Sequence, residues 1–112
     1  MEVTTMLGPI SVLSVRGDIN SNTLRELVER ADQVLNKGYH DLIIDLHEVN
    51  YISSGGLVAI QRIMGRAAER GGKTVLAGVT PRVAQVLDVM GFSQHFNIFP
   101  DVAAAQASFP RG

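Results

Sequence analysis

The passage from Tyr39 to Arg70 limits the possible folds more than any other part of the sequence. It includes the apolar run Leu42 to Ile44, whose length is typical of a buried strand. A short polar passage then leads to Ser53-Ser54-Gly55-Gly56, and apolar residues at helical spacing begin at Leu57. The passage therefore predicts a strand, a loop and a helix. Residues 53–57, which we call the corner, lie where the helix is expected to begin.

The corner combines several features that favour binding. The first turn of a helix leaves backbone N–H groups without intrahelical partners and carries partial positive charge. The hydroxyl of Ser53 or Ser54 can cap these groups, and Gly55 and Gly56 let a ligand or another chain approach the backbone closely. Capping alone would already account for the serines. The combination predicts a site for a phosphate group or for a protein partner and does not choose between them.

Strand and helix patterns alternate along the rest of the chain. We expect strands at residues 1–6, 10–15, 42–46, 73–79 and 95–99, and helices at residues 24–37, 57–70, 81–90 and 102–109. The order ββαβαβαβα predicts an α/β fold, with four helices on a mostly parallel mixed sheet of about five strands and an antiparallel edge strand from the opening hairpin. A chain of 112 residues is expected to form one domain, 1–112. The loops at residues 17–22, 47–56 and 78–81 would form the working edge of the sheet.

Two local patterns make further predictions. Thr23 and Glu26 have the spacing of a capping box, which predicts that the Thr23 side chain caps the first helix. Val83, Leu87 and Met90 fall on one face of the third helix and predict its buried stripe.

Composition excludes several classes of function. Ten basic and eleven acidic residues leave a net charge of −1, so nothing indicates binding to nucleic acid or to an anionic membrane surface. The absence of cysteine excludes disulfides, thiol catalysis and thiolate metal sites. The apolar runs are far too short to span a bilayer, and no signal-peptide pattern follows Met1. We therefore expect a cytoplasmic protein without membrane association.

Three possible catalytic or metal-binding patterns have simpler interpretations. Residues 67–74 match a loose phosphate-loop pattern, but here a helix ends and a strand begins, which reverses the required order. Ser54 and Gly56 resemble part of a nucleophile elbow, whose preceding glycine is replaced by Ile52. The histidines at positions 40, 47 and 95 lack the spacing of metal ligands and are expected at the surface or at strand ends. No cofactor, metal or catalytic residue is predicted.

At the corner the sequence resembles the STAS domain family, named for sulphate transporters and anti-sigma factor antagonists, and in particular its small stand-alone bacterial members. In these proteins a strand ends in Asp-Leu, and after a spacer Asp-Ser-Ser-Gly-Leu opens a helix. The corresponding residues here are Asp45-Leu46 and Ser53-Ser54-Gly55-Gly56-Leu57. Gly17-Asp18-Ile19-Asn20 is similar to the family's second signature, Gly-x-Leu-Asp, and residues 80–92 resemble a later helix followed by Gly-Phe. The resemblance covers nearly the whole chain.

The resemblance implies the STAS fold and a regulatory role without catalysis. In the family, an antagonist binds an anti-sigma factor that is also an ATP-dependent serine kinase of the histidine-kinase-like ATPase fold, and this partner switching regulates transcription. Phosphorylation of the second serine in Asp-Ser-Ser-Gly blocks binding, and a metal-dependent phosphatase restores it. The physical reason is that a phosphoryl group adds about −1.5 to −2 charges and bulk to a packed interface.

This sequence departs from the family pattern at the switch itself. Ser53 stands where the family has aspartate, Ser54 where it has the first serine, and Gly55 where it has the phosphate acceptor. Asn20 likewise replaces an aspartate. Ser54 and Ser53 remain the candidate acceptors, although a shift of one residue rotates a side chain by about 100° around a helix. A binding module without a phosphoswitch is the other possibility.

The docking surface is expected to combine the corner with the neighbouring loop and the helix that follows. The candidate contact residues are Asn20, Asn22, Ser53, Ser54, Gly55, Gly56, Leu57, Val58, Arg62 and Arg66. Arg62, Arg66 and Arg70 lie four residues apart and predict an exposed basic face.

Two other functions are compatible with the same pattern. A stand-alone STAS domain can serve as an accessory subunit of a lipid or anion transport complex, and the missing acceptor favours that role. The helix start could also bind an anion or a nucleotide, which would make the protein a sensor.

Overall fold

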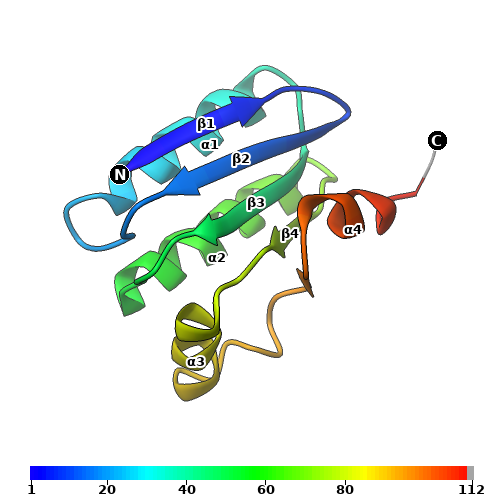
Figure 1. Cartoon of the computed structure of the whole chain (residues 1–112). Helices are drawn as coiled ribbons and strands as arrows, with labels where there is room; N and C mark the ends of the chain where they lie inside the picture. Colours follow the sequence, from blue (N-terminus) through cyan, green and yellow to red (C-terminus); the bar gives the residue numbers. More distant parts are fainter. Residues whose placement is uncertain (111–112) are drawn as a thin grey trace.

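The computed structural model describes residues 1–110 and contains the predicted order of strands and helices (Figure 1). The elements are β1 (Glu2–Met6), β2 (Ile10–Arg16), α1 (Leu24–Asn36), β3 (Asp41–Glu48), α2 (Ser54–Glu69), β4 (Thr74–Ala77), α3 (Pro81–Val89), β5 (Ile98–Phe99) and α4 (Val102–Ala107). Within the described residues, no helix is both long enough and apolar enough to cross a membrane.

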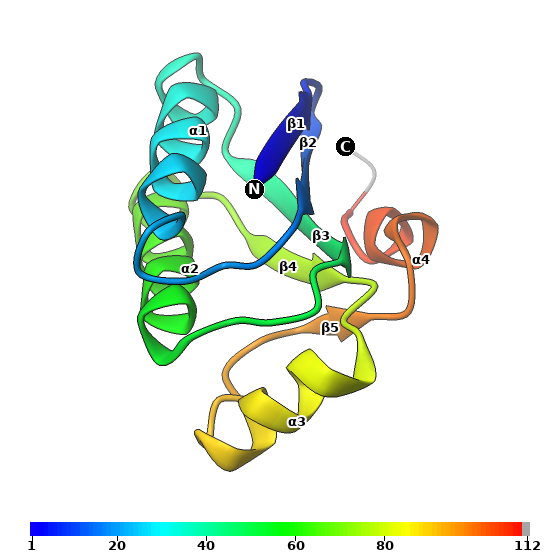
Figure 2. The same ribbon diagram turned by 60° about the vertical axis from the view of Figure 1, so that its left-hand side comes forward.

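The strands form one mixed sheet in the order β1-β2-β3-β4-β5. β1 pairs antiparallel with β2, and the other neighbouring strands pair in parallel. Helices α1 and α2 lie side by side on one face of the sheet, and α4 lies on the other (Figure 2). α3 lies at the end of the molecule where α2 begins (Figure 2).

The core has two parts because side chains alternate across β3. Leu42, Ile44 and Leu46 are fully buried and belong to the larger cluster, beneath α1 and α2. Ile43 points to the opposite face, where it packs in a smaller cluster that includes Phe109. The strand is therefore buried on both faces, which explains its unbroken apolar run.

Several element boundaries differ from the sequence prediction. α2 starts at Ser54, three residues before the first apolar residue of its pattern. The last strand covers only Ile98–Phe99, because the preceding residues form a turn in which the His95 amide donates to the Phe92 carbonyl, 2.9 Å away. The aromatic rings of Phe92 and Phe96 stack with centroids 5.9 Å apart and hold this turn in place.

Most of the pattern predicted for the third helix, α3, is confirmed. Thr80 caps it, with its hydroxyl accepting from the Val83 amide at 3.4 Å. Val83 and Leu87 are buried as expected. The prediction for Met90 is wrong, because this residue follows the last helical position and its side chain is 45% exposed. The apparent phosphate loop is also excluded by the fold, since α2 ends at Glu69 and β4 begins at Thr74.

Candidate functional site

The start of α2 is capped by the first serine of the corner. Ser53 has an extended backbone conformation, and its hydroxyl oxygen accepts a hydrogen bond from the Gly56 amide at 3.0 Å. The Ser53 carbonyl accepts from the Leu57 amide at 3.1 Å. Ser54 is therefore the first helical residue, and its side chain is exposed beside the positive end of the helix dipole.

Two loops that are distant in sequence are joined at the corner. The Ser53 amide donates to the Ile19 carbonyl at 2.8 Å, and the Ile19 amide donates to the Tyr51 carbonyl at 2.9 Å. Ile19 and Ile52 also form an isolated parallel bridge. These bonds extend the pairing of β2 and β3 past the ends of the two strands, so that the loop after β2 and the corner form one continuous surface.

The two glycines of the corner have different roles. Gly55 is exposed, and a Cβ added there would meet Leu24 Cδ2 at 3.4 Å, an ordinary contact distance, so a side chain fits. Gly56 is buried, and an added Cβ would lie only 2.8 Å from side-chain carbons of both Ile19 and Ile52. Gly56 therefore permits close packing of the two loops and is not available to a partner.

Leu57 also faces inward. Its side chain is 0% exposed, because α2 presents this position to the sheet, whereas the next residue, Val58, is 48% exposed. The expectation that Leu57 and Gly56 contact a partner is therefore wrong, since the helix buries them. Tyr51, which the sequence reasoning did not include, is 48% exposed next to the corner and adds an aromatic side chain to the surface.

The loop after β2 is held by its own side chains. Asn20 Oδ1 accepts from the Asn22 amide at 2.9 Å, and the Asn20 amide donates to Thr23 Oγ1 at 2.9 Å. Thr23 Oγ1 in turn donates to the Asp18 carbonyl at 2.8 Å. Thr23 makes no side-chain cap bond to α1, so the predicted capping box is wrong: the loop uses the hydroxyl instead. Asn22 remains exposed, and Asn20 is partly buried.

The basic face of α2 is only partly available. Arg66 forms an ion pair with Asp32 of α1, and Arg70 donates to the side-chain oxygen of Asn36 at 3.2 Å. Both contacts connect the two helices across their exposed edges. Arg62 is exposed one turn closer to the corner. Of the predicted stripe, Arg62 and Arg70 are therefore exposed, while Arg66 is partly buried and pairs with α1.

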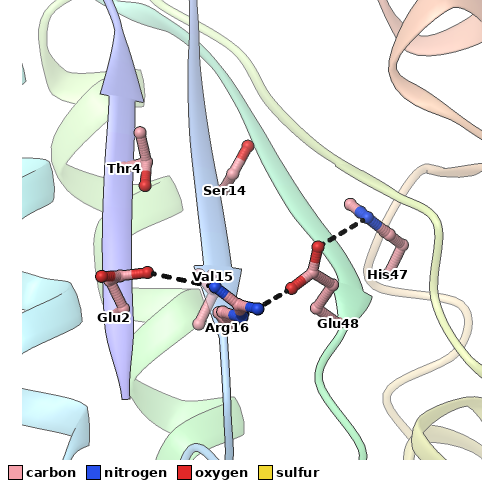
Figure 3. Close-up of a pocket in the computed structure, with 7 residues that line it drawn as sticks. All are labelled: Glu2, Thr4, Ser14, Val15, Arg16, His47 and Glu48. Carbon is pink, nitrogen blue, oxygen red and sulfur yellow. Dashed lines mark ion pairs between the residues drawn. The ribbon is translucent and has the colours of Figure 1, made fainter.

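A cluster of charged residues at the ends of the first three strands was missed by the sequence reasoning (Figure 3). His47 Nδ1 lies 2.9 Å from Asp45 Oδ1, and His47 Nε2 lies 3.3 Å from Glu48 Oε1. Glu48 Oε2 contacts Arg16 Nε at 3.1 Å, and Arg16 is 3.8 Å from Glu2. The available signal was the spacing of Asp45 and His47, which places both on one face of a strand.

The carboxylates raise the pKa of His47 above its ordinary value of 6.5. The largest cause is the hydrogen bond to Asp45, followed by the negative charge of that residue; Glu48 adds a smaller contribution, and burial opposes all three. Among residues 1–110, no three His, Asp or Glu side chains are arranged so that they could hold a metal ion together.

The fold and the corner together define a class of protein. The STAS domain family model matches residues 3–105, and the chain therefore belongs to the STAS domain family. It is 30% identical over 93 residues to RsfB of Mycobacterium tuberculosis, an anti-sigma-F factor antagonist, covering 80% of this chain and 73% of RsfB. It is 28% identical over 98 residues to BtrV of Bordetella bronchiseptica, named as a candidate anti-sigma factor antagonist, covering 88% of this chain and 84% of BtrV.

Solved structures agree with this assignment at the level of the fold. A crystal structure of a candidate anti-sigma factor antagonist from Thermotoga maritima superposes with a TM-score of 0.88 at 21% identity, covering 97% of this chain and 95% of the other. The predicted STAS fold is thus confirmed.

Proposed function

We propose that this protein is an anti-sigma factor antagonist that acts in the cytoplasm as a single STAS domain, residues 1–112. The corner docks on an anti-sigma factor of the serine-kinase type and displaces the sigma factor, and the protein performs no chemistry itself. The observation that carries the proposal is the exposed helix start at Ser54 and Gly55, joined by backbone hydrogen bonds to the loop that carries Asn20. The kinship with RsfB and BtrV supports it.

The docking surface that we propose contains the accessible residues around the corner. These are Asn20, Asn22, Tyr51, Ser53, Ser54, Gly55, Val58 and Arg62. Val58 and Tyr51 provide exposed apolar area, and the amides of Ser54 and Gly55, which precede the intrahelical hydrogen bonds of α2, provide donors. Such a mixture of an apolar centre and polar surroundings is typical of a protein interface.

Ser54 is the better placed of the two candidate phosphate acceptors. Its side chain is exposed, whereas the Ser53 hydroxyl is engaged in capping Gly56. A phosphate on Ser54 would lie at the positive end of α2, which stabilises the modified form, and would add about −1.5 to −2 charges to the docking surface. We therefore propose that the anti-sigma factor kinase phosphorylates Ser54 to release the antagonist, and that a metal-dependent phosphatase reverses the reaction.

The docking proposal is tested by placing a charge on the surface. Gly55→Glu puts a carboxylate where the family carries its phosphate, and the available space means that the fold should tolerate it. We expect binding to the co-encoded kinase-type anti-sigma factor, measured by calorimetry, to weaken tenfold or more, or about 1.4 kcal/mol. The matched control is Gly65→Glu, an exposed position on the same helix with nothing within 4 Å of an added Cβ, about 15 Å further along. Equal affinity for the two variants would refute the docking surface.

The phosphorylation proposal has a separate test. After incubation with that kinase and ATP, mass spectrometry should locate one phosphate on Ser54, and the Ser54→Ala variant should remain unmodified. Phosphate on another residue, or none at all, would contradict the switch without affecting the docking result.

An accessory role in a transport complex is the second candidate. The observation in its favour is Gly55, which supplies no hydroxyl at the family's acceptor position. Neighbouring genes for a transport ATPase and the absence of a kinase-type anti-sigma factor would support this role over the first.

A further inference from the structure

His47 occupies an irregular position at the end of β3. The pairing of β2 with β3 shifts there: Ser14 pairs with Asp45 but Arg16 pairs with Glu48, so β3 contains one extra residue. Normal alternation would place Glu48 on the opposite face from His47. The bulge brings the side chains of Asp45, His47 and Glu48 together on one face of the sheet, as bulges next to functional loops commonly do.

The geometry of this cluster fits a protonated histidine ring. A neutral imidazole has one N–H donor and one lone pair, whereas an imidazolium donates from both nitrogens. Nδ1 lies 2.9 Å from each oxygen of Asp45, and Nε2 lies 3.3 Å from Glu48 Oε1. If the ring loses its proton, it can keep its donor toward only one carboxylate. Asp45 is 6% exposed and also accepts from the His47 amide, so the contact with Glu48 is the one expected to break.

Glu48 is bonded to the loop after β2, and through that loop it is linked to the corner. Its carbonyl oxygen accepts from the Gly17 amide at 3.1 Å, where the loop after β2 begins. Two residues beyond Gly17, the Ile19 carbonyl accepts from the Ser53 amide at the corner. The backbone of Glu48 is therefore linked by hydrogen bonds to the loop after β2 and, through Ile19, to the corner.

We propose that His47 forms a proton-dependent latch that joins Asp45 to Glu48 and so holds the two loops in their docking arrangement. The latch rests on the proposed docking surface, but its groups all lie within this chain, so its test needs no partner and can fail while the docking result stands. Several groups face the ring or continue its network from neighbouring elements, and they determine the charge around it. They are Glu2 of β1, Arg16 of β2, Asp45 and Glu48 of β3, and Asp101 at the start of α4, which lines a cavity of about 380 Å³ with His47.

The loop after β4 packs against the base of the His47 side chain. Gly78, in the loop after β4, has φ of +66°, and a Cβ added there would lie 2.8 Å from His47 Cβ and 3.1 Å from Asp45 Oδ1. The start of the His47 side chain and the Asp45 carboxylate are therefore packed against the loop after β4, while the side chain of His47 as a whole is 60% exposed and the ring is free to respond when its charge changes.

The test is a pH titration of the free protein by NMR, from about pH 5.5 to about pH 9, the interval in which histidine charges change. The ring signal of His47 and the backbone amide signals of Gly17 and Ser53 are followed together. We expect the amide signals to shift with the same midpoint as the ring, above the ordinary 6.5. In His47→Gln this transition of the amides should disappear, and in the control His95→Gln, at an exposed position in another loop, it should persist.

Two variants that remove a charge near His47 should move the midpoint of its titration in opposite directions. Glu48→Gln removes an anion next to Nε2 and should lower the His47 midpoint, whereas Arg16→Gln removes a competing cation from Glu48 and should raise it. Amide signals that stay constant while His47 titrates would overturn the latch, as would a His47 midpoint that is the same in Glu48→Gln as in the wild type. These two variants decide the question even if His47→Gln does not fold.

Discussion

The substitution Gly56→Ala should destabilise the protein by overpacking the contact between the two docking loops. The added methyl carbon would lie 2.8 Å from Ile19 Cγ2 and 2.8 Å from Ile52 Cγ1, and 3.3 Å from the Ile19 carbonyl oxygen. Both isoleucine side chains are buried, so they have little room to move away. Extra carbons in a well-packed core cost about 1 to 3 kcal/mol.

The expected loss of stability in Gly56→Ala is partly offset, because alanine is favoured over glycine in a helix by up to about 1 kcal/mol. Gly65→Ala is the matched control: it lies in the same helix, is exposed, and has nothing within 4 Å of the added carbon. The difference in unfolding free energy between the two variants should therefore be about 1 to 3 kcal/mol, with Gly56→Ala the less stable. For a chain of this size, each kcal/mol corresponds to a change of about 4 °C in Tm.

Urea unfolding followed by circular dichroism measures this difference directly. Amide hydrogen exchange provides a second measurement, because the Ser53 amide, bonded to the Ile19 carbonyl at 2.8 Å, should exchange faster in Gly56→Ala if the two loops are forced apart. If Gly56→Ala and Gly65→Ala unfold at the same urea concentration, a methyl group fits between Ile19 and Ile52, and the reasoning is refuted.

Three further predictions concern single side chains. Ser53→Ala removes the cap of α2 and should lower the free energy of unfolding, measured in urea, by about 1 kcal/mol. Ser54→Ala, at an exposed position, should change it by less than about 0.5 kcal/mol. Equal losses in the two variants would contradict the assigned cap. The pKa of His47 is raised in the folded state, so protonated His47 stabilises the fold fully below pH 6.5, and this contribution is lost as the pH rises through the folded pKa. The stability of His47→Gln should therefore fall less over that pH interval than the stability of the wild type. Parallel curves of unfolding free energy against pH for the two proteins would argue against this assignment. Asp32→Asn breaks the ion pair with Arg66, in which the Asp32 side chain is 35% exposed and the Arg66 side chain 37%. The loss of unfolding free energy should therefore be below about 1 kcal/mol and should become smaller at high salt in thermal melts. A larger loss that does not depend on salt would contradict this view of the ion pair.

Much of the fold could be predicted because the strongest patterns are local. The run Leu42 to Ile44 is apolar at every position since β3 is buried on both faces, and a strand with that pattern has few other places in a small α/β protein. Thr80-Pro81 predicts a helix start through backbone geometry alone. The opening hairpin and the alternation of strands and helices then predict the mostly parallel sheet and its antiparallel edge strand β1.

The errors arise where one side chain has two possible partners. The Thr23 hydroxyl could cap α1, as its spacing with Glu26 suggested, or bond within the loop, and the loop provides both a carbonyl and an amide at hydrogen-bond distance. Arg66 could face solvent or pair with Asp32, and that choice depends on how α1 packs against α2. Spacing within one segment contains no information about the segment that will lie beside it.

The sequence by itself determined the order of the elements, the burial of β3 and the presence of a helix start rich in serine and glycine, because these depend on hydrophobic periodicity and on backbone preferences within a few residues. Only the tertiary structure decided which of those residues are accessible. Ser54 and Gly55 remain exposed while Gly56 is enclosed by Ile19 and Ile52, and a bulge in β3 brings His47 between two carboxylates. Both outcomes follow from the pairing of β2 with β3 and of the loops beyond them, which places residues about 30 positions apart in direct contact.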